Sequence, residues 1–157
     1  MSTDYIVSSL PALQFDAPAP ISWKSFAEMC GGDEFIDALL AQRGWPDIET
    51  QLRNAMAEAR GGAKYVRPAK GCSLYWKHRV DACFQEFDVY AREKMLDKAW
   101  WDAAGELSPP ESPLGKGALA AYAVRLRIAL RRSSISQERG GAVFDAVTSE
   151  TKTVFNS

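Results

Sequence analysis

The residues that could perform acid–base or metal chemistry are few and scattered along the chain. The single histidine, His78, is followed by Asp81, a spacing that allows one contact across a helical turn. A metal site needs more ligands at facing positions, and neither Cys72 nor Cys83 faces His78 on a helix. We therefore expect a solvated helical pair, with no metal and no cofactor.

Sequence motifs of catalysis are also missing. No serine stands in a G-x-S-x-G turn, and the common glycine-rich phosphate-binding patterns do not occur. Gly115-Lys116-Gly117 precedes a predicted helix and could present amides to an anion, but so short a match is more typical of a loop. Asp97 and Asp102 are carboxylates that we expect on the surface. The sequence disfavours an enzyme, so a small hydrolase or phosphate-binding enzyme is the weakest alternative.

Composition indicates one ordinary globular domain. The chain has 157 residues, 46% hydrophobic and 25% charged, and a formal net charge of −1. Residues 1–50 are acidic, with eight acids and two bases (−6), whereas residues 51–157 carry twelve acids and seventeen bases (+5). So small a net charge gives no overall attraction to nucleic acid or to an anionic membrane. We predict a single helical domain over residues 1–157, complete or part of a longer protein.

Cysteine content and the N-terminus favour a cytoplasmic protein. Three cysteines without C-x-x-C spacing argue against a disulfide framework and for a reducing compartment. The N-terminus lacks a basic flank, and its short apolar run ends at Pro11, so we expect no signal peptide. No stretch approaches roughly eighteen consecutive apolar residues, so we expect no membrane span.

One stretch, residues 73–104, predicts the element that would position the rest. It contains no proline or glycine, Ser73 can cap its start, and Gly105 can end it. Its apolar residues recur at helical spacing: Trp76, Val80, Cys83, Phe84, Phe87, Ala91 and Met95. A helix of that length would be about 45 Å long. We therefore predict an all-α fold, an irregular helical bundle built on one long central helix over about 73–104.

Shorter helices are expected on both sides of this rod. Upstream, three helices are predicted between Ser22, as a cap, and residue 61, with Pro46 at a first helical position. They end, in order, at Gly31-Gly32, Gly44 and Gly61-Gly62. Residues 5–10 predict an extended or single-turn piece. Downstream, residues 117–134 predict a helix, and residues 135–157 a partly flexible tail with a short helix at 142–147.

Aromatic and arginine side chains are the strongest candidates for a partner-binding surface. Trp100 and Trp101 are adjacent, and neighbours in a helix point about 100° apart, so one of them should leave the core. The 117–134 helix carries four arginines, on a protein-facing or acid-pairing surface or on an ordinary solvated face. The predicted partner-binding residues are Trp76, Arg79, Trp100, Trp101, Arg125, Arg127, Arg131 and Arg132.

Residues 64–79 support an alternative function. Lys64, Arg67 and Lys70 alternate with tyrosines and a tryptophan, a combination that single-stranded nucleic acid can use. The sequence pI of about 5.9 is far below the basic values of dedicated nucleic-acid binders. Nucleic acid is therefore a disfavoured partner, and a stand-alone adaptor of other proteins is the broader form of this alternative.

Three segments resemble proteins of rotary ATPases. Cys83 to Trp100, with the core Phe84-x-Glu86-Phe87-Asp88-x-Tyr90, resembles a pattern in the helical C-type subunit of the central stalk of V/A-type ATPases, whose eukaryotic counterpart is the d-type subunit. The segment from Tyr122 to Ser134 looks like the one that follows in that family. Tyr5 to Pro11 is similar to the start of a bacterial family of uncharacterised proteins encoded in V-type ATPase operons.

The resemblance implies a function without catalysis. In the family of C-type stalk subunits, helical bundles form a funnel that seats on the membrane rotor ring and receives the central shaft. This chain would then be a non-enzymatic subunit or accessory protein of a bacterial V/A-type ATPase. Its expected partners are rotor subunits, and it would be peripheral to the inner membrane through the complex while the ATPase carries out proton or sodium transport.

Overall fold

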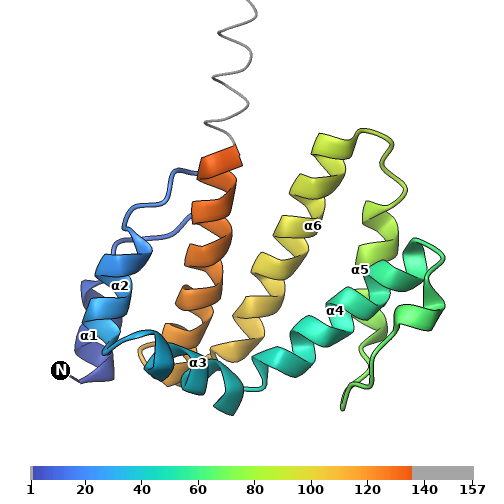
Figure 1. Cartoon of the computed structure of the whole chain (residues 1–157). Coiled ribbons are helices and arrows are strands. Elements are labelled where there is room, and N and C mark those ends of the chain that lie inside the picture. The colour runs from blue at the N-terminus through green and yellow to red at the C-terminus, as the bar shows by residue number, and fades with distance from the viewer. Residues whose placement is uncertain (1, 136–157) are drawn as a thin grey trace, which may run out of the picture.

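The computed structural model describes residues 2–135, and every regular element in that range is a helix (Figure 1). In chain order these are α1 (Thr3–Ser9), α2 (Trp23–Cys30), α3 (Asp33–Gln42), α4 (Trp45–Ala59), the 3₁₀ turn η1 (Ala63–Tyr65), α5 (Leu74–Cys83), α6 (Val89–Ala104), the 3₁₀ turn η2 (Gly105–Leu107) and a helix over 116–135. The predicted all-α fold is confirmed. The helix predicted at 142–147 and the tail from residue 136 lie outside the described residues.

The predicted single rod over 73–104 is wrong. Ser73 does cap a helix, since its Oγ accepts the Trp76 N–H, but α5 ends at Cys83 and α6 begins at Val89. The chain reverses between them, so α5 and α6 form an antiparallel hairpin beside α4 (Figure 1). Folding back lets both halves pack against α4 and against each other.

Polar capping, not a helix-breaking residue, makes this reversal. The Asp88 carboxylate accepts the Ala91 N–H at 3.2 Å and starts α6, while Glu86 accepts the Asp88 N–H at 3.1 Å. The apolar register shifts at the same point. Phe87 and Met95 of the predicted stripe are exposed, and α6 buries Leu96, Ala99 and Ala103 instead. A helix continued through Cys83 would have turned the wrong face of α6 inward.

The 116–135 helix is the element that most of the core surrounds. It lies between α2 and α6 (Figure 1). Leu119 and Leu126 are fully buried, and small residues on the other faces allow neighbours to approach closely: Ala120, Ala121, Ala123 and Ala129. Phe26 of α2 packs against Tyr122 with ring centroids 5.4 Å apart. A helix that is apolar on most of its circumference must be enclosed, and this one is.

The N-terminal residues form a helix and then a strap. Residues 3–9 make two turns of α1, longer than the extended or single-turn piece predicted. Residues 10–22, here called the N-terminal strap, then follow the 116–135 helix in the same direction. The Tyr122 hydroxyl donates to the Pro11 carbonyl at 2.7 Å, and the Ala19 N–H donates to the Ser133 hydroxyl at 3.2 Å. These bonds lay the strap along the helix surface.

The three predicted helices before residue 61 are confirmed, and their signals act as expected. Ser22 caps α2 through the Ser25 N–H, and Gly31 and Gly44 adopt left-handed conformations where helices end or begin. Pro46 lies in the first turn of α4.

Polar residues on one face of α4 hold the irregular segment that leads to α5. Asp47 accepts the backbone N–H groups of Lys70 and Gly71, and Asn54 bonds both the N–H and the carbonyl of Arg67. Gln51, between them on the helix, accepts the Ser73 N–H at 2.9 Å. The segment therefore obtains its backbone hydrogen bonds from side chains, which replace a strand or helix ladder.

Gly117 gives the first prediction, because the start of the 116–135 helix is packed against the preceding turn. A Cβ at this position would collide with the Leu107 carbonyl oxygen and lie 2.9 Å from Pro109 Cδ. We expect Gly117→Ala to lower the free energy of unfolding by about 1–3 kcal/mol, measured by urea denaturation. At Gly105 the backbone is helical and an added Cβ would meet the guanidinium end of Arg125 and no backbone atom, so Gly105→Ala should cost less stability than Gly117→Ala. Equal losses for the two variants would contradict this account.

Candidate functional site

A buried carboxylate joins α6 to the 116–135 helix. Asp97 is 7% exposed, and both its oxygens are paired: Oδ1 with Arg131 Nη2, and Oδ2 with Arg132 Nη1 at 3.0 Å. Arg131 and Arg132 belong to the last described turns of the long C-terminal helix. Our expectation that Asp97 lies on the surface is wrong, because α6 turns this face toward the two arginines.

The strap is joined to the same cluster. Arg132 also donates to Asp16 at 2.6 Å, and Lys94 of α6 reaches the other Asp16 oxygen at 2.8 Å. Hydrogen bonds from Lys94 and then from Arg132 lower the pKa of the Asp16 carboxyl. Burial lowers the pKa of Arg132, but its bonds to Asp16 and Asp97 outweigh burial and raise it. The strap, α6 and the 116–135 helix are thus linked by one network of ion pairs.

Phe15 adds an apolar anchor next to these charges. Its ring packs edge-on against Trp101 at 5.6 Å, with the Arg132 guanidinium 4.8 Å and the Lys98 ammonium 5.3 Å from its centroid. The residue that follows, Asp16, has a φ of 64°, a left-handed conformation that only a few non-glycine residues adopt. This bend lets one ring and one carboxylate from adjacent positions enter the same cluster.

A second charged cluster lies toward the other end of α6. Asp102 pairs with Arg79 of α5 at 2.5 Å and with Lys98 at 3.2 Å. Burial raises the pKa of Asp102, but these two cations outweigh it and the net shift is downward. Arg125 donates to the Trp101 carbonyl at 3.0 Å, and burial lowers its pKa. The cluster ties α5 to α6, and Arg125 ties the C-terminal helix to the same region.

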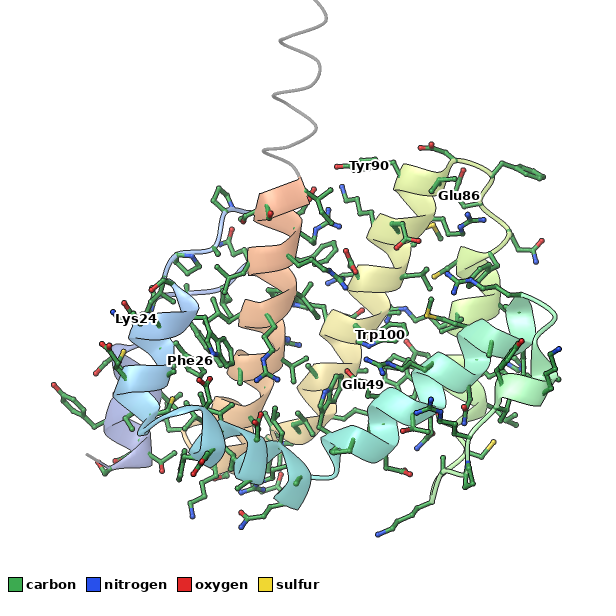
Figure 2. The ribbon with its side chains drawn as sticks, in the orientation of Figure 1. Lys24, Phe26, Glu49, Glu86, Tyr90 and Trp100 are labelled. Carbon is green, nitrogen blue, oxygen red and sulfur yellow. The ribbon has the colours of Figure 1, made fainter. Side chains whose placement is uncertain are left out.

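A groove opens between α4, α6 and the 116–135 helix. Its volume is about 440 Å³, and Figure 2 shows Glu49 of α4 and Trp100 of α6 next to each other along it. Its floor and sides are apolar, and its edges carry three arginines and three acids. The groove is lined by Trp45, Glu49, Arg53, Met56, Glu93, Leu96, Asp97, Trp100, Val124, Arg127, Ile128 and Arg131.

The three arginines along the groove are paired with acids of the same chain. Arg53 contacts Glu49 at 3.4 Å, and Arg127 contacts Asp37 at 3.4 Å while stacking on Trp23 with its Cζ 4.4 Å from the ring centroid. Arg53 is nevertheless 70% exposed at its side chain. The groove therefore presents an apolar floor with guanidinium groups that reach solvent at its edges.

The groove continues into a second hollow of about 600 Å³ at the start of α6. The two hollows share Glu93, Asp97 and Arg131, so they form one surface. The remaining lining of the second hollow is Asp16, Asp88, Val89, Tyr90, Lys94, Arg132 and Ile135. Asp97 and Arg131 thus line both hollows, and their ion pair also links α6 to the 116–135 helix.

The structure separates the predicted partner-binding residues into two groups. Trp100, Arg127 and Arg131 line the groove, and Arg132 lines the second hollow. Trp101 is the buried member of the tryptophan pair, which confirms that only one of the two lies in the core. The other residues face inward: Trp76 is buried, and Arg79 and Arg125 are half-buried in the second charged cluster. These four tryptophans and arginines stabilise the bundle.

Sequence reasoning missed the contribution of α4 to the groove. Glu49, Arg53 and Met56 recur at intervals of four and three residues, which places them on one face of that helix. This spacing is visible in the sequence, but it does not show which face of α4 is covered. That face is decided by the packing of the α5–α6 hairpin against α4.

Residues 64–79 are arranged differently from the groove. Lys64, Tyr65, Arg67 and Lys70 are exposed along the segment that α4 holds, whereas Trp76 is in the core. His78 is exposed and Asp81 is half-buried. The cations and tyrosines of this region therefore lie mainly on an irregular surface segment.

The buried cysteines are poor nucleophiles. Burial raises the pKa of the Cys30 thiol to about 11 and also raises that of Cys83, so neither forms a thiolate readily. Residues 2–135 contain no group of three or more histidine, cysteine or acidic residues arranged to hold a metal ion. Within the same range, no helix has both the length and the apolar character that crossing a bilayer requires.

Comparison with known proteins gives no relative: no family model, no curated protein and no solved structure matches this chain.

The Asp97 cluster gives the second prediction. Asp97→Ala leaves the guanidinium of Arg132, 12% exposed at its side chain, without one of its two carboxylates. We expect a loss of about 3 kcal/mol or more in the free energy of unfolding, measured by urea denaturation. Asp37→Ala breaks the exposed pair with Arg127 and should cost at most about 1 kcal/mol. An Asp97→Ala protein as stable as Asp37→Ala would show that the cluster does not hold the helices together.

Acid pH gives the third prediction. The carboxyl pKa values of Asp16 and Asp102 are lowered in the fold, so their stabilisation is present above the unfolded pKa and is lost as pH falls through the folded values. Unfolding free energy should therefore fall between about pH 5 and pH 3. Asp16→Asn should flatten this dependence, because the amide takes up no proton. An Asp16→Asn profile as steep as that of the unaltered protein would contradict this account.

Proposed function

We propose that the protein is a non-enzymatic helical adaptor that binds a partner protein in the groove between α4, α6 and the 116–135 helix. The observation that carries the proposal is the groove itself: Trp100 and other apolar side chains on the floor, and arginines at the edges. Interfaces favour aromatic and arginine residues at their centre and polar groups at their rim. An amphipathic helix with acidic residues beside its apolar face fits this chemistry.

The state of the charged residues supports an adaptor over a catalyst. The Asp97 carboxylate is engaged by two arginines, and Asp102 by an arginine and a lysine. A general acid or base must be free to exchange a proton with a substrate, whereas these carboxylates hold helices in place. Rigid walls of this kind suit a surface that transmits force through packing.

Rotor subunits of a bacterial V/A-type ATPase are the partners we propose. The support is the sequence resemblance over Cys83 to Trp100 and Tyr122 to Ser134. These two segments supply most of α6 and most of the 116–135 helix, which form two of the three walls of the groove. In this proposal the protein is a subunit or accessory of the central stalk. It would be cytoplasmic and peripheral to the inner membrane through the complex.

A second candidate function is favoured by a different surface. Lys64, Tyr65, Arg67 and Lys70 are all exposed, and backbone bonds to α4 fix the segment that carries them. Such a surface offers cations and a stacking ring to single-stranded nucleic acid. None of these four residues lines the groove or the second hollow, so we rank this surface below the groove.

Binding to purified V/A-type ATPase rotor subunits gives the fourth prediction. The unaltered protein should bind immobilised rotor subunits, measured by biolayer interferometry. Arg53→Glu with Arg127→Glu should weaken binding at least about tenfold, because it places carboxylates where acidic partner residues approach. Circular dichroism should show an unchanged helix content, since the Arg53 side chain is 70% exposed and that of Arg127 is 46% exposed.

The control pair is Lys24→Glu with Arg43→Glu, which makes the same change in net charge on α2 and at the end of α3, away from the groove lining. This variant should bind as the unaltered protein does. Equal weakening by both pairs would show a general charge effect and contradict the groove. Retention of single-stranded nucleic acid with a steep salt dependence, and no binding to rotor subunits, would favour the second candidate.

A further inference from the structure

The most exposed large apolar side chain among those described is Phe87, at 98%. It lies in the loop between α5 and α6, residues 84–88, here called the tip. Val89, the first residue of α6, is exposed as well. A phenylalanine in full contact with water does not stabilise the monomer. Exposed apolar side chains that lie next to each other mark contact sites.

Hydrogen bonds hold the tip in one conformation, so the backbone at Phe87 has a fixed position. Backbone bonds run from Phe84, Gln85 and Glu86 back to the last turn of α5, and Asp88 and Glu86 cap the start of α6. Phe84 anchors the loop beneath the guanidinium groups of Arg60 and Arg92, each 5.4 Å from its ring centroid. Binding through a side chain that is already positioned loses little conformational entropy.

The chemistry of the tip is complementary to that of the groove in the same chain. Phe87 stands between two carboxylates, Glu86 and Asp88. The groove is lined by apolar side chains such as Trp100 and by three arginines and three acids. Arg53 and Arg131, with side chains 70% and 58% exposed, reach solvent further than the acids they pair with, Glu49 at 33% and Asp97 at 10%. An aromatic ring flanked by acids therefore suits a hollow of about 440 Å³ whose arginines are more exposed than their paired acids.

We infer that the free protein forms a dimer in which the tip of each copy occupies the groove of the other. This inference rests on the proposed role of the groove as a protein-binding site, and it adds that a second copy fills this site until a partner displaces it. The tip and the groove lie on one continuous surface, because the second hollow includes Asp88 and Val89 and joins the groove at Glu93. Figure 2 shows Glu86 and Tyr90 at the tip end of α6 and Trp100 further along.

A reciprocal exchange of tips between two copies gives a closed dimer. When each copy gives its tip and receives the other's, the same patch serves on both sides, and a two-fold dimer results with no surface left to extend a filament. Reciprocity also doubles the contact area that a single tip would bury, which brings the interface closer to the area that a stable complex requires.

Analytical ultracentrifugation of the unaltered protein tests this inference. At concentrations up to about 100 µM, which reveal a micromolar Kd, the protein should sediment as a dimer in equilibrium with monomer. Phe87→Ser should raise the dimer Kd at least about tenfold, the effect expected for an aromatic anchor. The substituted side chain makes no buried contact, so the fold should be retained. Leu74→Ser, at an exposed apolar position at the far end of α5, is the control and should leave the Kd unchanged.

Charge exchange tests which surfaces meet. Glu86→Lys on the tip and Arg53→Glu in the groove should each weaken the dimer, and the two together should restore part of the affinity, because each tip lysine then faces a groove glutamate. Restoration is partial because Glu86→Lys also removes the carboxylate that accepts the Asp88 N–H. A photoreactive p-benzoylphenylalanine at position 87 should cross-link to α4, α6 or the 116–135 helix of a second copy. A mixture of ¹⁵N-labelled and unlabelled protein identifies links between copies by mass.

Several results would overturn the inference. These are a monomer at every concentration, a dimer that Phe87→Ser leaves intact, and cross-links confined to one chain. Binding of the monomer to phosphatidylcholine vesicles through Phe87 would assign the tip to a membrane instead. None of these bears on rotor binding, which is measured separately, and failure to bind rotor subunits leaves the sedimentation result standing.

Discussion

The arrangement of the bundle depends on the ion pairs that Asp97 makes with Arg131 and Arg132. The buried residues of α6 and of the 116–135 helix are mostly alanines and other aliphatic side chains, which define the distance between helices well but their rotation and register poorly. A buried carboxylate accepts only those registers in which guanidinium groups reach both its oxygens. Because Arg132 also holds Asp16, the same register decides where the N-terminal strap lies. One charged cluster therefore positions three segments that are far apart in the sequence.

Local signals in the sequence predicted the helices but not how they are arranged. Caps such as Ser22 and Ser73, the left-handed glycines and Pro46 act within one turn, and the structure has them where the sequence places them. The reversal after Cys83 was missed because glutamine, glutamate and phenylalanine are compatible with a helix. The capping strength of Asp88 was overlooked in favour of an apolar spacing that continued through the turn. The burial of Asp97 was missed for a related reason: a carboxylate is buried only when cations from another segment reach it, and those lie about 35 residues away in sequence.

Part of the candidate site could also be predicted from the sequence. The four arginines of the last helix were expected either to pair with acids or to face solvent, and Arg127, Arg131 and Arg132 pair with Asp37, Asp97 and Asp16. The groove itself needs α4, whose position follows from the α5–α6 hairpin. Trp76 and Trp101 were among the predicted partner-binding residues, yet both are buried, as large aromatic side chains usually are.

These features connect the stability of the fold to the proposed binding surface in the groove. Arg131 lies in the wall shared by the two hollows and also neutralises Asp97, so a partner that attracts its guanidinium outward would withdraw part of that charge from the buried pair. Arg132 would remain, because its side chain is much less exposed and has a second carboxylate in Asp16. The cluster thus divides its two arginines by position: Arg132 maintains the register of the helices, and the more exposed Arg131 is available to respond to what occupies the groove. A binding surface built in this way can change its outer charge without losing the joint that gives it shape.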